Sequence, residues 1–155
     1  MDDAIGAHLA LEARAGLTIK WPNDVLLGGA KLVGILLERA DDAVVIGIGI
    51  NCAHAPEVLG RTTAPLGGEV DPAVLIETLA ESVARWLARW RSEGLGPIRQ
   101  RWLERAHPIG TALVARVGDV AVEGLFDGLD SDGALLLRLA DGTRRVIHAA
   151  DVFLL

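Results

Sequence analysis

The sequence contains one cysteine, Cys52, and no tyrosine. A single cysteine excludes an internal disulfide, and with it the disulfide-rich frameworks of small secreted domains. No uncharged apolar run is long enough to span a bilayer, and the acidic start Met1-Asp2-Asp3 is unlike the basic start of a secretory signal. We therefore expect a cytoplasmic protein that does not insert into membranes.

Basic residues are outnumbered by acidic ones, 15 to 21, which gives a formal net charge of −6. This balance argues against nucleic acid as a partner, because nucleic-acid binding usually requires a net basic surface. Hydrophobic residues make up 51% and charged residues 23% of the 155 residues. This composition is typical of a packed globular protein with one domain, or with a small domain and an appendage.

The first half of the chain predicts a β-sheet that follows a short helix over residues 2–15. Pro22 interrupts the strand pattern at a turn, and Gly28-Gly29 is typical of a hairpin turn. The long apolar runs predict a sheet covered on both faces. The expected strands are 17–19, 25–27, 31–38 and 44–50, and a long loop follows over 52–70.

Two helices are expected next. Asp71-Pro72 predicts the start of the first helix, and Gly94 its end. Its apolar residues recur every three or four positions, which is typical of one buried helix face. They are Leu75, Ile76, Leu79, Val83, Trp86, Leu87 and Trp90. A shorter helix is expected after Pro97, with Ile98, Trp102 and Leu103 facing inward.

The pattern changes after His107-Pro108 to short strands separated by Gly and Asp turns. Five strands in fewer than fifty residues predict a small SH3-like β-barrel. The expected strands include 111–117, 120–126, 134–139 and 144–147. Together with the first half, this predicts an α+β fold in two parts.

One turn combines residues suited to chemistry. Lys20-Trp21-Pro22-Asn23-Asp24 places an ammonium, an amide and a carboxylate on a proline-locked turn. If Gly28-Gly29 forms a hairpin, Lys31 folds back toward Asp24, so that charges of both signs meet at one sheet edge. Gly34 would allow a ligand or another backbone to approach closely. The alternative interpretation is an exposed turn and a glycine that only relieves packing.

Three ordered motifs resemble the catalytic core of biotin protein ligases. They are Lys20-Trp21-Pro22-Asn23-Asp24, Lys31-Leu32-Val33-Gly34-Ile35-Leu36 and Gly47-Ile48-Gly49-Ile50-Asn51. The resemblance continues to Gly128-Leu129-Asp130 and Gly133-Ala134-Leu135-Leu136 near the C-terminus. It implies that residues 1–107 form the C-terminal portion of a biotin/lipoate ligase-type catalytic domain with a mixed sheet and helices. Residues 108–155 would form the SH3-like C-terminal domain.

The resemblance also implies a two-step reaction. Biotin and ATP, with Mg²⁺, first form biotinyl-5′-adenylate, and a lysine of a biotin carboxyl carrier domain of a carboxylase then attacks it. Lys31 matches the family lysine that contacts the biotin carboxylate and the α-phosphate. Asp24 matches the carboxylate that orients or deprotonates the acceptor lysine.

Further binding roles follow from the same resemblance. Lys20 and Asn23 match positions on the ATP side, where they would contact phosphate or ribose. Asn51 matches a residue near the adenine. Gly34 and Ile35 would line the biotin pocket. A surface charge that holds the turn remains an alternative for Lys20, and a turn residue that ends a strand remains one for Asn51.

Other candidate sites are weaker. Gly47-x-Gly49 lacks the third glycine and the following helix of a dinucleotide-binding motif. Cys52 and His54 are too few for a zinc site, so no protein metal site is expected. Trp21 is interpreted as structural, and Trp86 and Trp90 as core residues rather than stacking platforms.

The chain departs from the family before its first motif, since only nineteen residues precede Lys20. The Gly/Arg-rich loop that closes over biotin in the family is not found there. We therefore expect an open sheet edge and a fragment, a degenerate relative, or a chain completed by a homodimer partner or a separate N-terminal half. The functional alternatives are a non-catalytic module that binds biotin, its adenylate or a carrier domain, and a lipoate–protein ligase relative.

Overall fold

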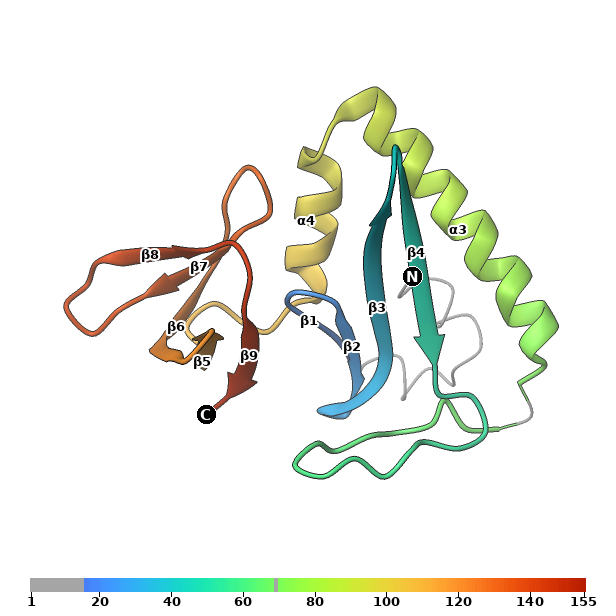
Figure 1. The fold of residues 1–155 in the computed structure, drawn as a ribbon, viewed down its shortest axis with the longest axis horizontal. Helices are drawn as coiled ribbons and strands as arrows, with labels where there is room; N and C mark the ends of the chain where they lie inside the picture. The colour runs from blue at the N-terminus through green and yellow to red at the C-terminus, as the bar shows by residue number, and fades with distance from the viewer. Residues whose placement is uncertain (1–15, 69) are drawn as a thin grey trace. The chain divides into compact units, whose positions relative to one another are not determined.

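The computed structural model describes residues 16–68 and 70–155, and it divides into two compact units, Met1–Leu87 and Ala88–Leu155 (Figure 1). The helix predicted for residues 2–15 lies outside the described residues. Each unit contains one antiparallel sheet, and two helices are described. The predicted α+β class is confirmed.

The sheet of the first unit follows the predicted strand pattern, in the order β1-β2-β3-β4. All four described strands pair antiparallel, whereas a mixed sheet was expected. Parallel pairing occurs there only as an isolated bridge between Lys31 and Thr63. The strands are β1 (Leu17–Lys20), β2 (Asp24–Leu27), β3 (Ala30–Ala40) and β4 (Ala43–Ile50).

The core of this unit lies where the sheet meets the first turns of α3 (Pro72–Glu93). Leu32 and Val33 have no exposed surface, and each such burial contributes about 1.5–3 kcal/mol. The buried cluster consists of Leu17, Val25, Leu32, Val33, Leu66 and Leu75.

The expectation of a sheet covered on both faces is wrong for the far half of β3 and β4. These strands continue past Gly34, which pairs with Asp24, the first residue of β2. Beyond that point β3 pairs only with β4 among the described residues, and β4 only with β3. The side chains there are at least half exposed: Leu36, Leu37, Val44, Val45 and Ile46. The expected open edge is therefore present in the described part of the sheet.

Helix α3 confirms the predicted boundaries but not the whole predicted face. The Ala73 amide donates to Asp71 Oδ1 over 2.9 Å, and Gly94 follows the helix with φ of +76°. Ile76 and Trp90 were expected in the core, yet they are 64% and 51% exposed. The fully buried residues of α3 are Leu75 and Ser82. No described helix is long and apolar enough to cross a membrane.

The second unit contains the predicted C-terminal strands as a five-stranded antiparallel sheet, in the order β8-β7-β6-β5-β9. The predicted barrel is not closed, because β8 and β9 lie at opposite edges of this described sheet. The strands are β5 (Ala112–Val117), β6 (Val120–Leu129), β7 (Leu135–Arg138), β8 (Arg144–Ile147) and β9 (Asp151–Leu154).

Helix α4 (Gly96–Arg105) packs on β6 within this unit. Arg99 donates from Nε and Nη2 to the carbonyl oxygen of Leu129, over 2.9 and 2.7 Å. The Trp102 ring meets Phe126 edge-on at 6.2 Å. The inward residues predicted for this helix are half-buried, and Trp102 among them contacts the C-terminal sheet. The domain boundary at 107/108 stays a prediction.

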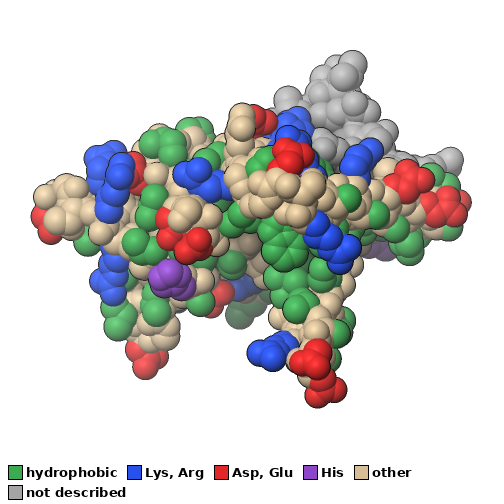
Figure 2. Space-filling view, turned by 90° about the horizontal axis from the view of Figure 1, so that it is seen from above, with side chains coloured by type: hydrophobic (Ala, Val, Ile, Leu, Met, Phe, Trp, Pro, Cys, Tyr) green, Lys and Arg blue, Asp and Glu red, His purple; other side chains and the backbone are tan. Residues whose placement is uncertain are grey.

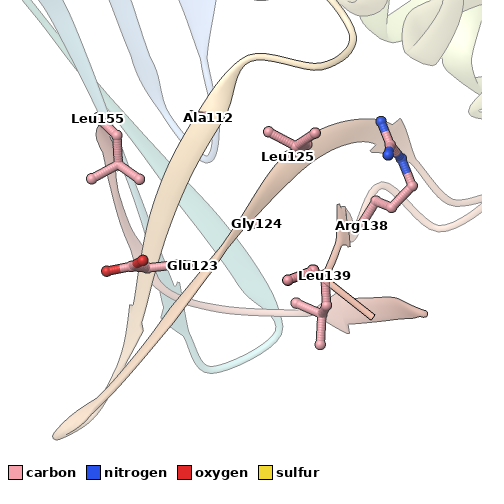
Figure 3. Close-up of a pocket in the computed structure, with 8 residues that line it drawn as sticks. Ala112, Glu123, Gly124, Leu125, Arg138, Leu139 and Leu155 are labelled. Atoms are coloured by element: carbon pink, nitrogen blue, oxygen red, sulfur yellow. The ribbon is translucent and has the colours of Figure 1, made fainter. Parts of the chain in front are cut away.

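A shallow hollow of about 420 Å³ lies on the C-terminal sheet (Figure 3). Leu125, Leu139 and Leu155 contribute its apolar lining, with Glu123 and Arg138 beside them.

Figure 2 shows acidic and basic side chains in small interspersed groups over the visible face.

Candidate active site

The strand β1 and the strand β2 bring two charged residues opposite each other. Lys20 and Asp24 are cross-strand partners, separated by the turn Trp21–Asn23. The peptide bond between Trp21 and Pro22 is cis, and the Trp21 side chain is buried, in agreement with its structural interpretation. The turn therefore positions the Asp24 carboxylate beside the Lys20 ammonium.

A β-bulge in β3 decides where Lys31 points. Val25 pairs with Val33 and Leu26 pairs with Lys31, so Leu32 is an extra residue on β3. Residues three apart on a regular strand face opposite sides, but one inserted residue restores the same side. The bulge therefore puts Lys31 on the same face as Gly34, over Asp24.

The site is a carboxylate held between two ammonium groups. Asp24 is 7% exposed, and its Oδ1 atom lies 2.5 Å from Lys31 Nζ. Its Oδ2 atom lies 3.3 Å from Lys20 Nζ. The structure thus confirms that the hairpin brings Lys31 back to Asp24. Two cations and one anion leave this cluster with one positive charge, which suits an anionic ligand.

Gly34 makes room for this arrangement. A Cβ atom at position 34 would lie 3.1 Å from both Cε and Nζ of Lys31, and 3.9 Å from Asp24 Oδ1. Carbon atoms in ordinary contact lie about 3.5–4.0 Å apart, so a side chain here would displace the Lys31 ammonium.

We expect Gly34→Ala to displace the Lys31 ammonium without unfolding the sheet, because the flexible end of a lysine can yield. The free energy of unfolding should change by less than about 1 kcal/mol, while the adenylate formation that the sequence resemblance implies slows about tenfold. Gly47→Ala is the matched control, since its Cβ would meet only ordinary contacts of 3.7 and 3.8 Å at Leu36. Equal rates for the two variants would contradict this role of Gly34.

Asn23 and Ile35 tie the charged turn to β3. Asn23 Nδ2 donates to the Ile35 carbonyl oxygen over 2.6 Å, and the Ile35 amide donates to the Asn23 carbonyl oxygen over 2.9 Å. The Ile35 side chain packs against the core cluster of the first unit. Asn23 therefore lies beside the cluster, but its amide group is engaged with the backbone.

Asn51 lies farther along the same region with its side-chain N–H groups engaged. Asn51 Nδ2 donates to the carbonyl oxygens of Lys31 and Ala64, each over 3.2 Å. These bonds join β3 to the segment that follows β4. The geometry gives Asn51 a structural function next to Lys31, in line with the alternative of a residue that ends a strand.

Loss of the Asn51 amide should destabilise the fold. We expect Asn51→Ala to lower the free energy of unfolding by about 2 kcal/mol, because the half-buried Ala64 carbonyl oxygen loses its side-chain donor and the Lys31 carbonyl oxygen keeps only the bond from the Ala64 amide. Asn23→Ala, which removes an exposed bond, should cost less than about 1 kcal/mol. Urea denaturation of both variants measures this difference, and equal losses would contradict it.

One contribution to the site escaped the sequence interpretation. The segment 61–66, expected to be plain loop, pairs with the backbone of Lys31. The Lys31 amide donates to the Thr62 carbonyl oxygen over 2.8 Å, and the Ala64 amide donates to the Lys31 carbonyl oxygen over 3.0 Å. Only the β-branched pair Thr62-Thr63 hinted at extended structure there.

The fold is similar to solved biotin protein ligases. The Aquifex aeolicus biotin protein ligase in complex with biotin and ATP matches with a TM-score of 0.84 at 20% identity. The match covers 99% of this chain and 69% of that chain. In this chain, β1, β2 and β3 of the first unit present the lysine–aspartate cluster.

Sequence comparisons agree. The sequence model of the biotin/lipoate A/B protein ligase family matches residues 11–52, and that of the biotin protein ligase C-terminal domain matches residues 113–155. The biotin–[acetyl-CoA-carboxylase] ligase of Paracoccus denitrificans is 45% identical over 165 residues, covering 97% of this chain and 68% of the relative.

A second relative is the bifunctional ligase/repressor BirA of Bacillus subtilis, 32% identical over 96% of this chain and 50% of its own length. The chain thus spans about two thirds of the Paracoccus relative and half of the Bacillus relative. It belongs to the biotin protein ligase family, as its three motifs predicted.

Proposed function

We propose that this protein joins biotin to a lysine of a biotin carboxyl carrier domain in two ATP-dependent steps. The observation that carries the proposal is the pairing of Lys31 with the buried Asp24 over the bare backbone of Gly34. These residues belong to the motifs by which the chain resembles the ligase family. The name of the Paracoccus relative supports a carboxylase as the source of the acceptor domain.

In the first step, Lys31 supplies positive charge where two anions must meet. A biotin carboxylate oxygen attacks the α-phosphorus of ATP, a new P–O bond forms, and pyrophosphate leaves with the electrons of the broken bond. Repulsion between the carboxylate and the phosphates opposes this approach. A fixed ammonium that contacts both lowers that repulsion, most strongly in a site shielded from water.

In the second step, Asp24 acts as the base. The acceptor lysine attacks the carbonyl carbon of the adenylate, an amide bond forms, and AMP leaves. The attacking nitrogen needs a free lone pair, so its ammonium form must first lose a proton. Asp24 becomes available as a proton acceptor once the Lys31 ammonium has moved to the substrate.

The remaining site assignments are proposals of the same kind. Asn23 would face the phosphate or ribose of ATP, and Gly34 and Ile35 would line the biotin pocket. Asn51 would approach the adenine with its carboxamide oxygen, because its N–H groups are engaged. The resemblance assigns Lys20 to the nucleotide side, and its ammonium also contacts Asp24 Oδ2.

The described residues offer no protein site that fits Mg²⁺. Within residues 16–68 and 70–155, no group of three or more His, Cys, Asp or Glu side chains could hold a metal ion. Asp24, the carboxylate of the cluster, already pairs with two lysines. We therefore propose that Mg²⁺ is a partner of the ATP phosphates, and we derive no step through a protein-bound ion.

The test is to incubate the purified protein with biotin and Mg-ATP and to detect biotinyl-5′-adenylate by mass spectrometry. Adenylate formation, followed by biotin transfer to a carrier domain, is the expected result. Adenylate binding without turnover would overturn the proposal in favour of a binding module. Competition by lipoate but not by biotin would overturn it in favour of a lipoate ligase.

Two further parts of this proposal concern assembly and location. A homodimer, or a complementing N-terminal half, is the partner expected from the open edge of β4, and sedimentation measures it. A cytoplasmic location is expected from the single cysteine, and cell fractionation measures it.

A further inference from the structure

Asp24 receives a separate cation on each carboxylate oxygen. Lys31 Nζ lies 2.5 Å from Oδ1, and Lys20 Nζ lies 3.3 Å from Oδ2. Lys20 and Lys31 are the only two lysines in the sequence, so every lysine of the chain is placed on this one carboxylate. The chain has thirteen arginines for its other positive charges.

The two lysines are held differently. Lys20 is the cross-strand partner of Asp24, and the short turn between β1 and β2 fixes the separation of the two backbones. Lys31 reaches Asp24 across Gly34, where no side chain blocks its tip. The Lys31 side chain is 30% exposed and that of Lys20 is 21% exposed. The Lys31 side chain is therefore the more exposed of the two, and the bare backbone of Gly34 leaves room beside its tip.

Movement of Lys31 would leave the buried Asp24 carboxylate without this ion pair, and Lys20 supplies a second one. A carboxylate that is 7% exposed is strongly destabilised when its ionic partner leaves, because water does not replace the lost charge. This penalty would hold Lys31 on Asp24 and away from the substrate. A second ammonium on the other oxygen keeps the carboxylate paired throughout.

We propose that Lys20 is a positioning residue that serves as the standing counter-ion of Asp24. Lys20 remains on Asp24 while Lys31 transfers from Asp24 to the biotin carboxylate and the α-phosphate. Asp24 consequently stays charged and ready to receive the proton of the acceptor lysine. The inference rests on the proposed function, and it replaces a direct contact between Lys20 and ATP with an action through Asp24.

A double-mutant cycle on the first step separates the two roles. Lys20→Met is expected to lower kcat for adenylate formation about tenfold, with the KM for ATP changed less than about twofold, and Lys20→Arg to restore most of the rate. In the Asp24→Asn background, Lys20→Met should change kcat less than about twofold, because the charge it compensates is gone.

An equal loss of kcat in both backgrounds would overturn the inference, as would a raised KM for ATP at unchanged kcat. Either result would assign Lys20 to the nucleotide. Absence of adenylate from the wild-type protein would instead overturn the proposed function, so the two failures are distinguishable.

Lysine-labelled NMR supplies a readout that does not depend on turnover. The spectrum contains two side-chain Cε–Hε signals, assigned with Lys20→Arg and Lys31→Arg. Asp24→Asn should move both signals in the ligand-free protein. In the wild-type protein, addition of biotin and α,β-methylene ATP should move the Lys31 signal and leave the Lys20 signal in place. A Lys20 signal that follows the ligand while Lys31 stays would overturn the inference, and two unmoved signals would overturn the proposed function.

Discussion

Replacing Lys31 with alanine is expected to slow adenylate formation by about a thousandfold. The substitution removes the ammonium that lies over Gly34, and the other ammonium of the described cluster, that of Lys20, lies at the far oxygen of Asp24. Biotin and the triphosphate then meet without the charge that offsets their repulsion. Pyrophosphate release at saturating biotin and ATP measures the rate.

Arg39→Ala is the matched control for this prediction. Arg39 lies on the same strand β3, near its far end, where its Nε donates to the Asp41 carbonyl oxygen. Removing this exposed positive charge should leave adenylate formation within about twofold of the wild-type rate. Wild-type rates for Lys31→Ala in a folded protein would exclude Lys31 from the first step.

Replacing Asp24 with asparagine is expected to separate the two steps. The amide has nearly the same shape as the carboxylate but cannot accept a proton from the acceptor lysine. Adenylate formation should therefore continue within about tenfold of its normal rate, while transfer slows by about a thousandfold. Single-turnover transfer from preformed biotinyl-adenylate to a carrier domain measures the second step.

The control is Asp42→Asn in the exposed turn between β3 and β4. This variant should transfer biotin at the wild-type rate, since Asp42 lies at the far end of the sheet from Asp24. Thermal unfolding of Asp24→Asn tests whether repulsion between the two lysine ammonium groups destabilises the fold when no carboxylate lies between them. Normal transfer by a folded Asp24→Asn protein would mean that another group, or the solvent, removes the proton.

The local sequence pattern was sufficient to predict the features that depend on neighbouring residues alone. The Gly28-Gly29 hairpin follows from two glycines that adopt φ of +57° and +84°, which few other residues tolerate. The start of α3 follows from the Asp71 carboxylate, which accepts a bond from the Ala73 amide. Each of these features depends on residues within a few positions of one another.

The apolar sequence pattern gave wrong predictions of burial where the residues that would cover a side chain are distant in the sequence. Ile76 and Trp90 have helical spacing suited to a core, but their surroundings leave them exposed. Val44, Val45 and Ile46 have the apolar character of a buried strand, yet β3 and β4 run past the end of β2. Apolar residues predict that burial would be favourable, and not that a partner is present.

By itself, the sequence determined the family, the hairpin that returns Lys31 toward Asp24, and the residue types that an electrostatic ligation site needs. Only the tertiary structure decided how they meet. The extra residue Leu32 turns Lys31 to the face of Gly34, and the missing Cβ of Gly34 lets its ammonium reach Asp24. Strand pairing determines which face of the sheet each side chain occupies and which residues it contacts, because a shift of one residue sends every side chain to the opposite face.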